Sequence, residues 1–185
     1  MEITENEKGA LLLAARHSIK NFFDKTKSQQ IDYKIYPNLK LHLGAFVTLK
    51  INNELRGCIG YVFTKMTLYD TVCEAAKQAA FSDPRFFPMT IEELEFVKIE
   101  ISVLSYPEKI SSYDEIIIGR HGLMLEERYV KAVLLPQVAI SNNFNREDFL
   151  SAICEKGGLP LDTWKIKKLN LLVFTATIFS DENND

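Results

Sequence analysis

Cysteine is scarce in this sequence: the 185 residues include three thiols, Cys58, Cys73 and Cys154. An odd set of cysteines without metal-ligand spacing argues against a disulfide framework and against a zinc site, so no metal site is predicted. An excess of positive charge is also missing, because 22 Lys and Arg stand against 25 Asp and Glu. Proteins that bind nucleic acids in general carry a basic excess, so nucleic acid is an unexpected partner.

Long apolar runs are absent as well. No run approaches the ~20 residues that cross a bilayer, and the first seven residues are acidic where a secretion signal is basic and then apolar. We therefore expect a cytoplasmic protein without a membrane partner. Phosphate loops, dinucleotide fingerprints and nucleophile elbows are missing too, so no cofactor is predicted.

The hydrophobic pattern predicts a mixture of strands and helices. Period-two alternation on both sides of Asn52-Asn53 predicts a β-hairpin over residues 44–62. Polar caps followed by helical spacing predict three helices, with capping at Thr4 and Glu7, Thr67 and Asp70, and Asn145 and Asp148. Gly157 is expected to end the third helix in the left-handed conformation. Further strands are predicted over residues 96–104, 115–118, 123–125, 129–135 and 171–179. This mixture indicates an α+β fold, mainly an antiparallel sheet with flanking helices.

Residues 55–60, Leu-Arg-Gly-Cys-Ile-Gly, are the most informative segment. Glycine inside a strand usually marks a bulge or a close approach of another backbone or a ligand. Alternation places Arg56 and Cys58 on one face beside the bare Gly60, with Leu55 and Ile59 on the other face. A neighbouring cation favours the thiolate, so Cys58 is a candidate nucleophile. The alternative is packing: the glycines admit a helix close to the sheet, and Cys58 serves as a small hydrophobe.

Four other residues are candidates for chemistry. Asp83 and Arg85 are expected to pair and fix the turn after Pro84, although a guanidinium also suits an anionic ligand. His121 lies between two glycines in a predicted turn, which makes it the candidate general base or, more simply, a turn residue. Gln137 follows a strand that ends in proline, where it caps the strand or faces a cleft.

Taken together, these segments resemble the AMMECR family. The match runs in order from about residue 44 to residue 179. The residues that carry it are 55–60, Asp83-Pro84-Arg85-Phe86 with Pro88, Ile101-Ser102-Val103-Leu104, His121-Gly122-Leu123, Leu134-Leu135-Pro136-Gln137-Val138, and Cys154 with Lys156-Gly157-Gly158-Leu159 and Trp164. The family more often has alanine and then glycine where this chain has Gly157 and Gly158.

The resemblance implies a larger and a smaller lobe, with a cleft between them bordered by the Arg-Gly-Cys segment. We treat residues 1–185 as one domain of this type. Prokaryotic relatives are often encoded beside a Memo-like protein and a radical SAM protein, and the family has no firmly established activity. The predicted function is binding of a small molecule or modified residue, as an enzyme component acting with those two proteins. The alternative is a non-catalytic adaptor for protein interactions. The predicted site comprises Cys58 and His121 as catalytic residues and Arg56, Gly57, Gly60, Arg85 and Gln137 as binding residues.

Overall fold

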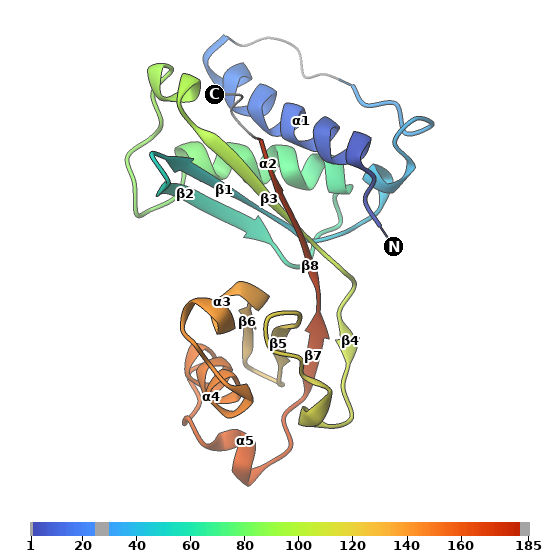
Figure 1. Ribbon diagram of the computed structural model, residues 1–185, viewed down its shortest axis with the longest axis vertical. Helices are drawn as coiled ribbons and strands as arrows, with labels where there is room; N and C mark the ends of the chain where they lie inside the picture. The colour runs from blue at the N-terminus through green and yellow to red at the C-terminus, as the bar shows by residue number, and fades with distance from the viewer. Residues whose placement is uncertain (1, 25–29, 182–185) are drawn as a thin grey trace. The chain divides into compact units, whose positions relative to one another are not determined.

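The computed structural model describes residues 2–24 and 30–181, and it divides the chain into two compact units (Figure 1). Unit 1 comprises Met1–Leu104 and Thr177–Asp185, and unit 2 comprises Ser105–Ala176. Each unit has its own four-stranded sheet and its own hydrophobic cluster. The predicted α+β fold with antiparallel pairing and flanking helices is confirmed.

The sheet of unit 1 has the strand order β2-β1-β3-β8. Its strands are β1 (Ala45–Ile51), β2 (Glu54–Tyr61), β3 (Lys98–Leu104) and β8 (Ala176–Ser180). Helices α1 (Glu5–Asp24) and α2 (Leu68–Phe81) cover one face of this sheet (Figure 1). Short 3-10 turns, η1 (Pro37–Lys40) and η2 (Glu92–Glu95), lie in the connections.

Local signals set these elements as predicted. The Thr4 Oγ1 accepts the Glu7 N–H at 3.3 Å and the Glu7 carboxylate accepts the Thr4 N–H at 3.0 Å, a reciprocal capping box at the start of α1. Thr67 caps α2 by accepting the Asp70 N–H. Asn52 and Asn53 both have positive φ, as the two-residue turn of a hairpin requires.

The sheet of unit 2 has the order β4-β7-β5-β6. It contains β4 (Glu108–Lys109), β5 (Gly122–Glu126), β6 (Lys131–Leu134) and β7 (Leu171–Phe174), with η3 (Tyr113–Glu115), α3 (Pro136–Ser141), α4 (Arg146–Lys156) and α5 (Thr163–Ile166). The apolar face of α4, with Phe149 and Ile153 buried, packs in one cluster with Leu123 and Leu171 from the sheet.

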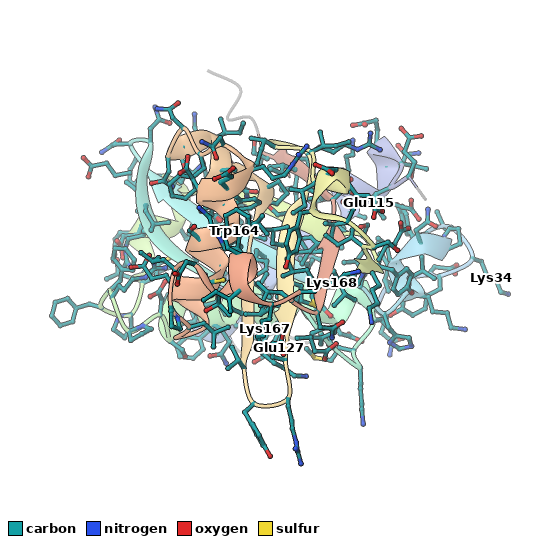
Figure 2. All side chains as sticks on the ribbon, turned by 90° about the horizontal axis from the view of Figure 1, so that it is seen from below. Lys34, Glu115, Glu127, Trp164, Lys167 and Lys168 are labelled. Atoms are coloured by element: carbon teal, nitrogen blue, oxygen red, sulfur yellow. The ribbon has the colours of Figure 1, made fainter. Side chains whose placement is uncertain are left out.

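A polar contact holds the start of β7 against the turn after β5. Glu127 accepts the Asn170 N–H at 3.2 Å and pairs with Lys167 at 3.2 Å (Figure 2). The pKa of Glu127 is lowered, chiefly by the hydrogen bond from the Asn170 backbone. Figure 2 shows Glu127 and Lys167 close together on the same face of the unit.

Three details differ from the sequence-based expectation. Residues 115–118 are not a strand, because the Ser112 and Glu115 side chains form a capping box that turns the chain into η3. The predicted strand 171–179 is two strands, β7 and β8, because the chain leaves one sheet and enters the other after Phe174. Gly157 has a φ of −81°, and the left-handed glycine after α4 is the next one, Gly158, with a φ of 71°.

Among the described residues, no helix combines the length and the apolar character needed to cross a membrane.

Candidate functional site

A β-bulge shapes the Arg-Gly-Cys segment of β2. Leu49 pairs with Gly57 while the next residue of β1, Lys50, pairs with Leu55, so Arg56 is the extra residue on β2. A bulge interrupts the alternation of side chains. The prediction that Leu55 and Ile59 share a face is therefore wrong: Leu55 is 42% exposed, and Ile59 packs against the core of unit 1.

The two glycines of the segment are required by packing. A Cβ at Gly57 would lie 2.1 Å from the carbonyl oxygen of Ala79, because α2 presses directly on β2 there. A Cβ at Gly60 would lie 2.3 Å from the ring of its cross-strand partner Phe46. The space beside Cys58 that the sequence suggested was empty is thus covered by the Phe46 ring. A binding role for Gly57 and Gly60 stays a prediction.

The backbone of Cys58 is held by an ion pair from another part of the chain. β2 is an edge strand of its sheet, so the outward N–H and C=O of Cys58 have no strand partner. Asp83 Oδ2 accepts the Cys58 N–H at 2.9 Å, and Arg85 Nη2 donates to the Cys58 carbonyl at 3.3 Å. Asp83 and Arg85 also bind each other at 2.7 Å and 3.0 Å. The predicted pairing of Asp83 with Arg85 is confirmed, and the pair fixes Cys58 as well as its own turn.

Burial and charge strengthen the Asp83–Arg85 pair that binds the Cys58 backbone, called here the Cys58 clamp. The Asp83 side chain is 2% exposed, whereas that of Arg85 is 54% exposed. The hydrogen bond from Arg85 holds the pKa of Asp83 well below its usual range, and the same bond raises the pKa of Arg85. Asp83 is therefore ionised at neutral pH in spite of its burial. The charge of Arg85 is already paired with Asp83, which weakens any attraction of Arg85 for an anion. Binding of an anion by Arg85 stays a prediction.

Arg56 is also engaged by a carboxylate. Its Nε and Nη2 donate to Glu93 at 2.6 Å and 2.9 Å, a bidentate pair that lowers the pKa of Glu93. Its guanidinium lies 5.9 Å from the centre of the Phe86 ring, and the Arg85 guanidinium lies 5.6 Å from the same ring. The third nitrogen of Arg56, Nη1, is buried without a hydrogen-bond partner among the described residues.

The sulfur of Cys58 has its own polar contact. Cys58 pairs across the strands with Thr48, and the Thr48 Oγ1 donates to the Cys58 Sγ at 3.3 Å. The side chain is half-buried and the thiol is free of any disulfide. Cys58 is thus a thiol on a rigid support, fixed at its N–H, its C=O and its sulfur.

The other two candidates belong to unit 2. His121 Nδ1 accepts the Ile117 backbone N–H at 3.3 Å, and the backbone N–H of His121 donates to the Ile117 carbonyl at 2.9 Å, so the ring and the backbone of His121 both stabilise the turn before β5. Gln137 lies in the first turn of α3, and its Oε1 is buried without a hydrogen-bond partner in the described part of the chain. Cys58 lies in unit 1 and His121 in unit 2, and their catalytic pairing stays a prediction.

Sequence reasoning missed two residues of the site, Thr48 and Glu93. Without the bulge, the hairpin register would have set Thr48 opposite Gly57, so its contact with Cys58 had no readable signal. Glu93 lies 37 residues after Arg56, and only the folded chain brings them together. No group of His, Cys, Asp or Glu in residues 2–24 and 30–181 is arranged to hold a metal ion.

Comparison with known proteins agrees with this description. The family model described as AMMECR1 matches residues 12–179. A protein of Methanosarcina mazei is 36% identical, over 99% of this chain and 96% of its own length. A Nanoarchaeum equitans protein is 37% identical, over 84% of this chain and 91% of its own length. The crystal structure of the uncharacterised protein PH0010 from Pyrococcus horikoshii superposes with a TM-score of 0.82 at 35% identity, covering 94% of this chain and 90% of that one. The chain therefore belongs to the AMMECR1 family.

Proposed function

We propose that this chain binds a small molecule or a modified residue, with the Arg56–Cys58 segment as the candidate contact in unit 1 and Gln137 as the candidate contact in unit 2. One observation carries the proposal. In the described part of the chain, the buried side-chain atoms that lack a hydrogen-bond partner are Arg56 Nη1 and Gln137 Oε1. Both residues were predicted from the sequence to bind a ligand.

Such atoms are costly to keep. Buried polar groups in folded proteins are almost always hydrogen-bonded, and an unsatisfied one costs ~1–3 kcal/mol. Residues that break this rule are expected at functional sites, where a ligand supplies the missing partner. A buried donor on Arg56 and a buried acceptor on Gln137 are therefore better explained by binding than by stability.

The charges around Arg56 limit the class of ligand. Arg56 is neutralised by Glu93 and Arg85 by Asp83, so neither guanidinium offers an unpaired positive charge. A polyanion gains little from such a site. At Arg56, the ligand group that fits best is a neutral hydrogen-bond acceptor for Nη1; at Gln137, taken by itself, it is an N–H or O–H donor for Oε1. Cys58 and His121 as catalytic residues, in an enzyme component acting with Memo-like and radical SAM proteins, remain part of this proposal.

The substitution Gln137→Met tests the proposal, because it keeps the length of the side chain and removes its amide. If Oε1 has no partner in the unliganded protein, the free energy of unfolding should rise by ~1 kcal/mol. Urea unfolding followed by the fluorescence of Trp164, the single tryptophan of the chain, reports on unit 2, which contains Gln137.

Asn142→Leu is the matched control, because the Asn142 amide donates to the Val138 carbonyl at 2.8 Å. This variant should lose stability. A loss of stability in Gln137→Met comparable to that of Asn142→Leu would show that the Gln137 amide serves the fold, and the proposal would be wrong.

A non-catalytic adaptor is the second candidate, and exposed apolar side chains favour it. Phe87 is 90% exposed and Phe96 65% exposed, in the segment that also supplies Asp83 and Glu93. Because Asp83 and Arg85 occupy the outward groups of Cys58, a partner strand cannot pair with β2 there. An adaptor would bind through these aromatic side chains instead. Phe87→Ser should then weaken binding of a Memo-like protein, while Tyr129→Ser, at an 85% exposed site in unit 2, should not.

A further inference from the structure

A hollow lies in unit 1, between α1 and α2, and its lining does not include the Arg56–Cys58 segment. Its volume is about 740 Å³, within the usual range for small-molecule sites. One stripe of each helix lines it, at the spacing of a single helix face. The lining residues are Ala14, His17, Ser18, Asn21, Phe22, Gln30, Ile31, Tyr33, Tyr69, Asp70, Cys73 and Lys77.

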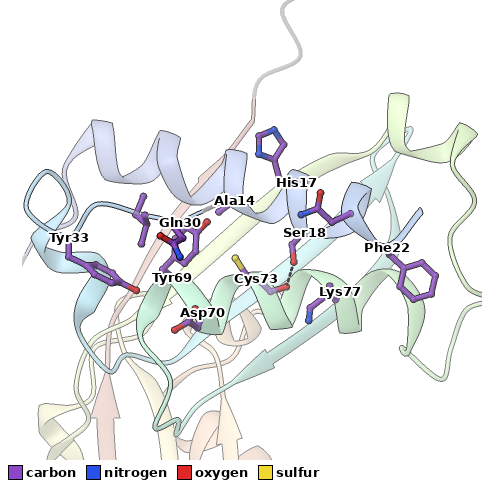
Figure 3. A pocket seen from close by; sticks show the side chains of 12 residues that line it. Ala14, His17, Ser18, Phe22, Gln30, Tyr33, Tyr69, Asp70, Cys73 and Lys77 are labelled. Carbon is purple, nitrogen blue, oxygen red and sulfur yellow. Dashed lines mark hydrogen bonds between the residues drawn. The ribbon is translucent and has the colours of Figure 1, made fainter. Parts of the chain in front are cut away.

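One end of this hollow combines aromatic and hydrogen-bonding side chains. Figure 3 shows Tyr33, Gln30, Tyr69 and Asp70 at the end where α2 begins, whereas Phe22 and Lys77 lie at the opposite end. A helix pair that only packs together would bring apolar side chains to its seam. Here the hollow between the two helices is lined in part by phenol, amide and carboxylate groups.

The central groups are uncharged at neutral pH. Burial raises the pKa of Tyr69 to about 12 and the pKa of Cys73 to about 11. The Ser18 hydroxyl donates to the Cys73 carbonyl at 2.8 Å, which fixes the two helices at this point. The middle of the lining thus includes two polar groups that carry no charge at neutral pH, the Tyr69 phenol and the Cys73 thiol.

The charged groups of the lining argue against a phosphate. Lys77 pairs with Glu74 at 2.5 Å, so its charge is already neutralised. Asp70 adds a negative charge at the end that holds the two tyrosines. A carboxylate there repels an anion and accepts hydrogen bonds from hydroxyl groups, as acidic residues do with the ribose of dinucleotides.

We propose that the hollow between α1 and α2 binds an uncharged nucleoside-like molecule, a planar heteroaromatic ring with a hydroxyl-bearing substituent. Tyr33 and Tyr69 offer aromatic faces on which such a ring stacks. The Gln30 amide, a donor and an acceptor together, matches the edge of a base. Asp70 accepts from the sugar hydroxyls. This site is independent of the function proposed for Arg56 and Cys58.

Titration of the full chain with adenosine, followed by the amide resonances in NMR spectra, tests the proposal. Saturable shifts are expected at Tyr33, Tyr69 and Cys73. AMP should bind at least about tenfold more weakly, because Asp70 repels its phosphate, a difference of ~1.4 kcal/mol. Indole, of similar ring size but with a single polar group, should give no saturable shifts.

Two variants make the test specific. Asp70→Asn should reduce the preference for adenosine over AMP toward unity, an effect that loss of structure alone would not produce. Lys20→Ala, an exposed position of α1 outside the lining, should keep the preference. Absence of shifts with adenosine, shifts confined to residues elsewhere, or equal binding of adenosine, AMP and indole would each overturn the proposal.

Discussion

Among single residues, the buried carboxylate of Asp83 does most to position Cys58. It accepts the Cys58 N–H and pairs with Arg85, which in turn binds the Cys58 carbonyl. The segments around Cys58 and Asp83, which both carry the resemblance to the family, therefore form one structural unit. In it, the Asp83–Arg85 ion pair occupies the outward hydrogen-bonding groups of Cys58 at the edge of β2. This ion pair thereby holds the Cys58 backbone in place.

Asp83→Asn should lower the free energy of unfolding by ~2 kcal/mol at pH 7, because the hydrogen bonds of the clamp lose their ionic character. Urea unfolding followed by far-UV circular dichroism measures this loss. The folded pKa of Asp83 is depressed, so its stabilisation is complete above its unfolded pKa of about 3.9 and is lost as the pH falls toward the folded value. The difference between wild type and variant should therefore shrink below about pH 4.

Asp114→Asn is the control for this experiment. Asp114 also pairs with an arginine, Arg146, at 2.7 Å, but its side chain is 86% exposed. Exposed pairs contribute less than ~1 kcal/mol, so little change is expected. Equal effects of the two substitutions, or a difference for Asp83→Asn that grows in acid, would contradict the assigned role of Asp83.

The position of single side chains could be predicted only where the signal is local. Asp83 and Arg85 are two residues apart, and their pairing was readable from the sequence. Arg56 was assigned to Cys58 because alternation places them on one face, but its guanidinium binds Glu93. Whether Arg56 contacts Cys58 or the carboxylate of Glu93, 37 residues later, is decided by the tertiary fold. The local sequence pattern carries no information about that contact.

Among the elements, the contact of α2 with β2 determines the shape of the site. The Ala79 carbonyl approaches Gly57 so closely that no side chain fits between helix and strand. The glycine pattern predicted a bulge or a close approach, and the structure has both. Which strand residue would be the extra one was not readable, because the turn alone predicts an uninterrupted register.

Gly57→Ala should destabilise unit 1 by ~1–3 kcal/mol, since an added Cβ would overlap the Ala79 carbonyl oxygen and force helix and strand apart. The matched control is Gly9→Ala in α1, where nothing lies within 4 Å of an added Cβ. That substitution should stabilise the protein by ~1 kcal/mol through helix propensity. Thermal unfolding of both variants measures the two effects, and a Gly57→Ala variant as stable as wild type would show that α2 does not press on β2.

At the scale of the whole molecule, the chain forms two cores. Unit 2 is a continuous segment inserted between β3 and the last strand of unit 1. The fold class was predictable because the period-two alternation of apolar residues indicates strands and the three capping signals indicate helices. The division into two sheets was not predicted strand by strand, since β7 and β8 read as one apolar run although they belong to different sheets.

Phe149→Ala, at a fully buried position in unit 2, should cost ~3–5 kcal/mol by leaving a cavity. Because the cores are separate, we expect the loss of amide hydrogen-exchange protection to be concentrated in β5 and β7. Protection of Val47 and Ile101 in unit 1 should change much less. Leu49→Ala should give the reverse distribution, and equal losses in both units from either variant would show a single cooperative core.

We have proposed the Arg56–Cys58 segment as an accessible and rigidly held binding site. The most direct test is the rate at which iodoacetamide alkylates each cysteine of the native protein at pH 7, read by peptide mass spectrometry. Cys73 and Cys154 serve as internal references, because burial raises the pKa of both thiols. We predict that Cys58 is alkylated first and that Asp83→Asn, by loosening the clamp, changes its rate but not the rate of Cys154. Alkylation of Cys58 no faster than that of the fully buried Cys154 would show a thiol packed away from ligands, and would contradict a binding site at this segment.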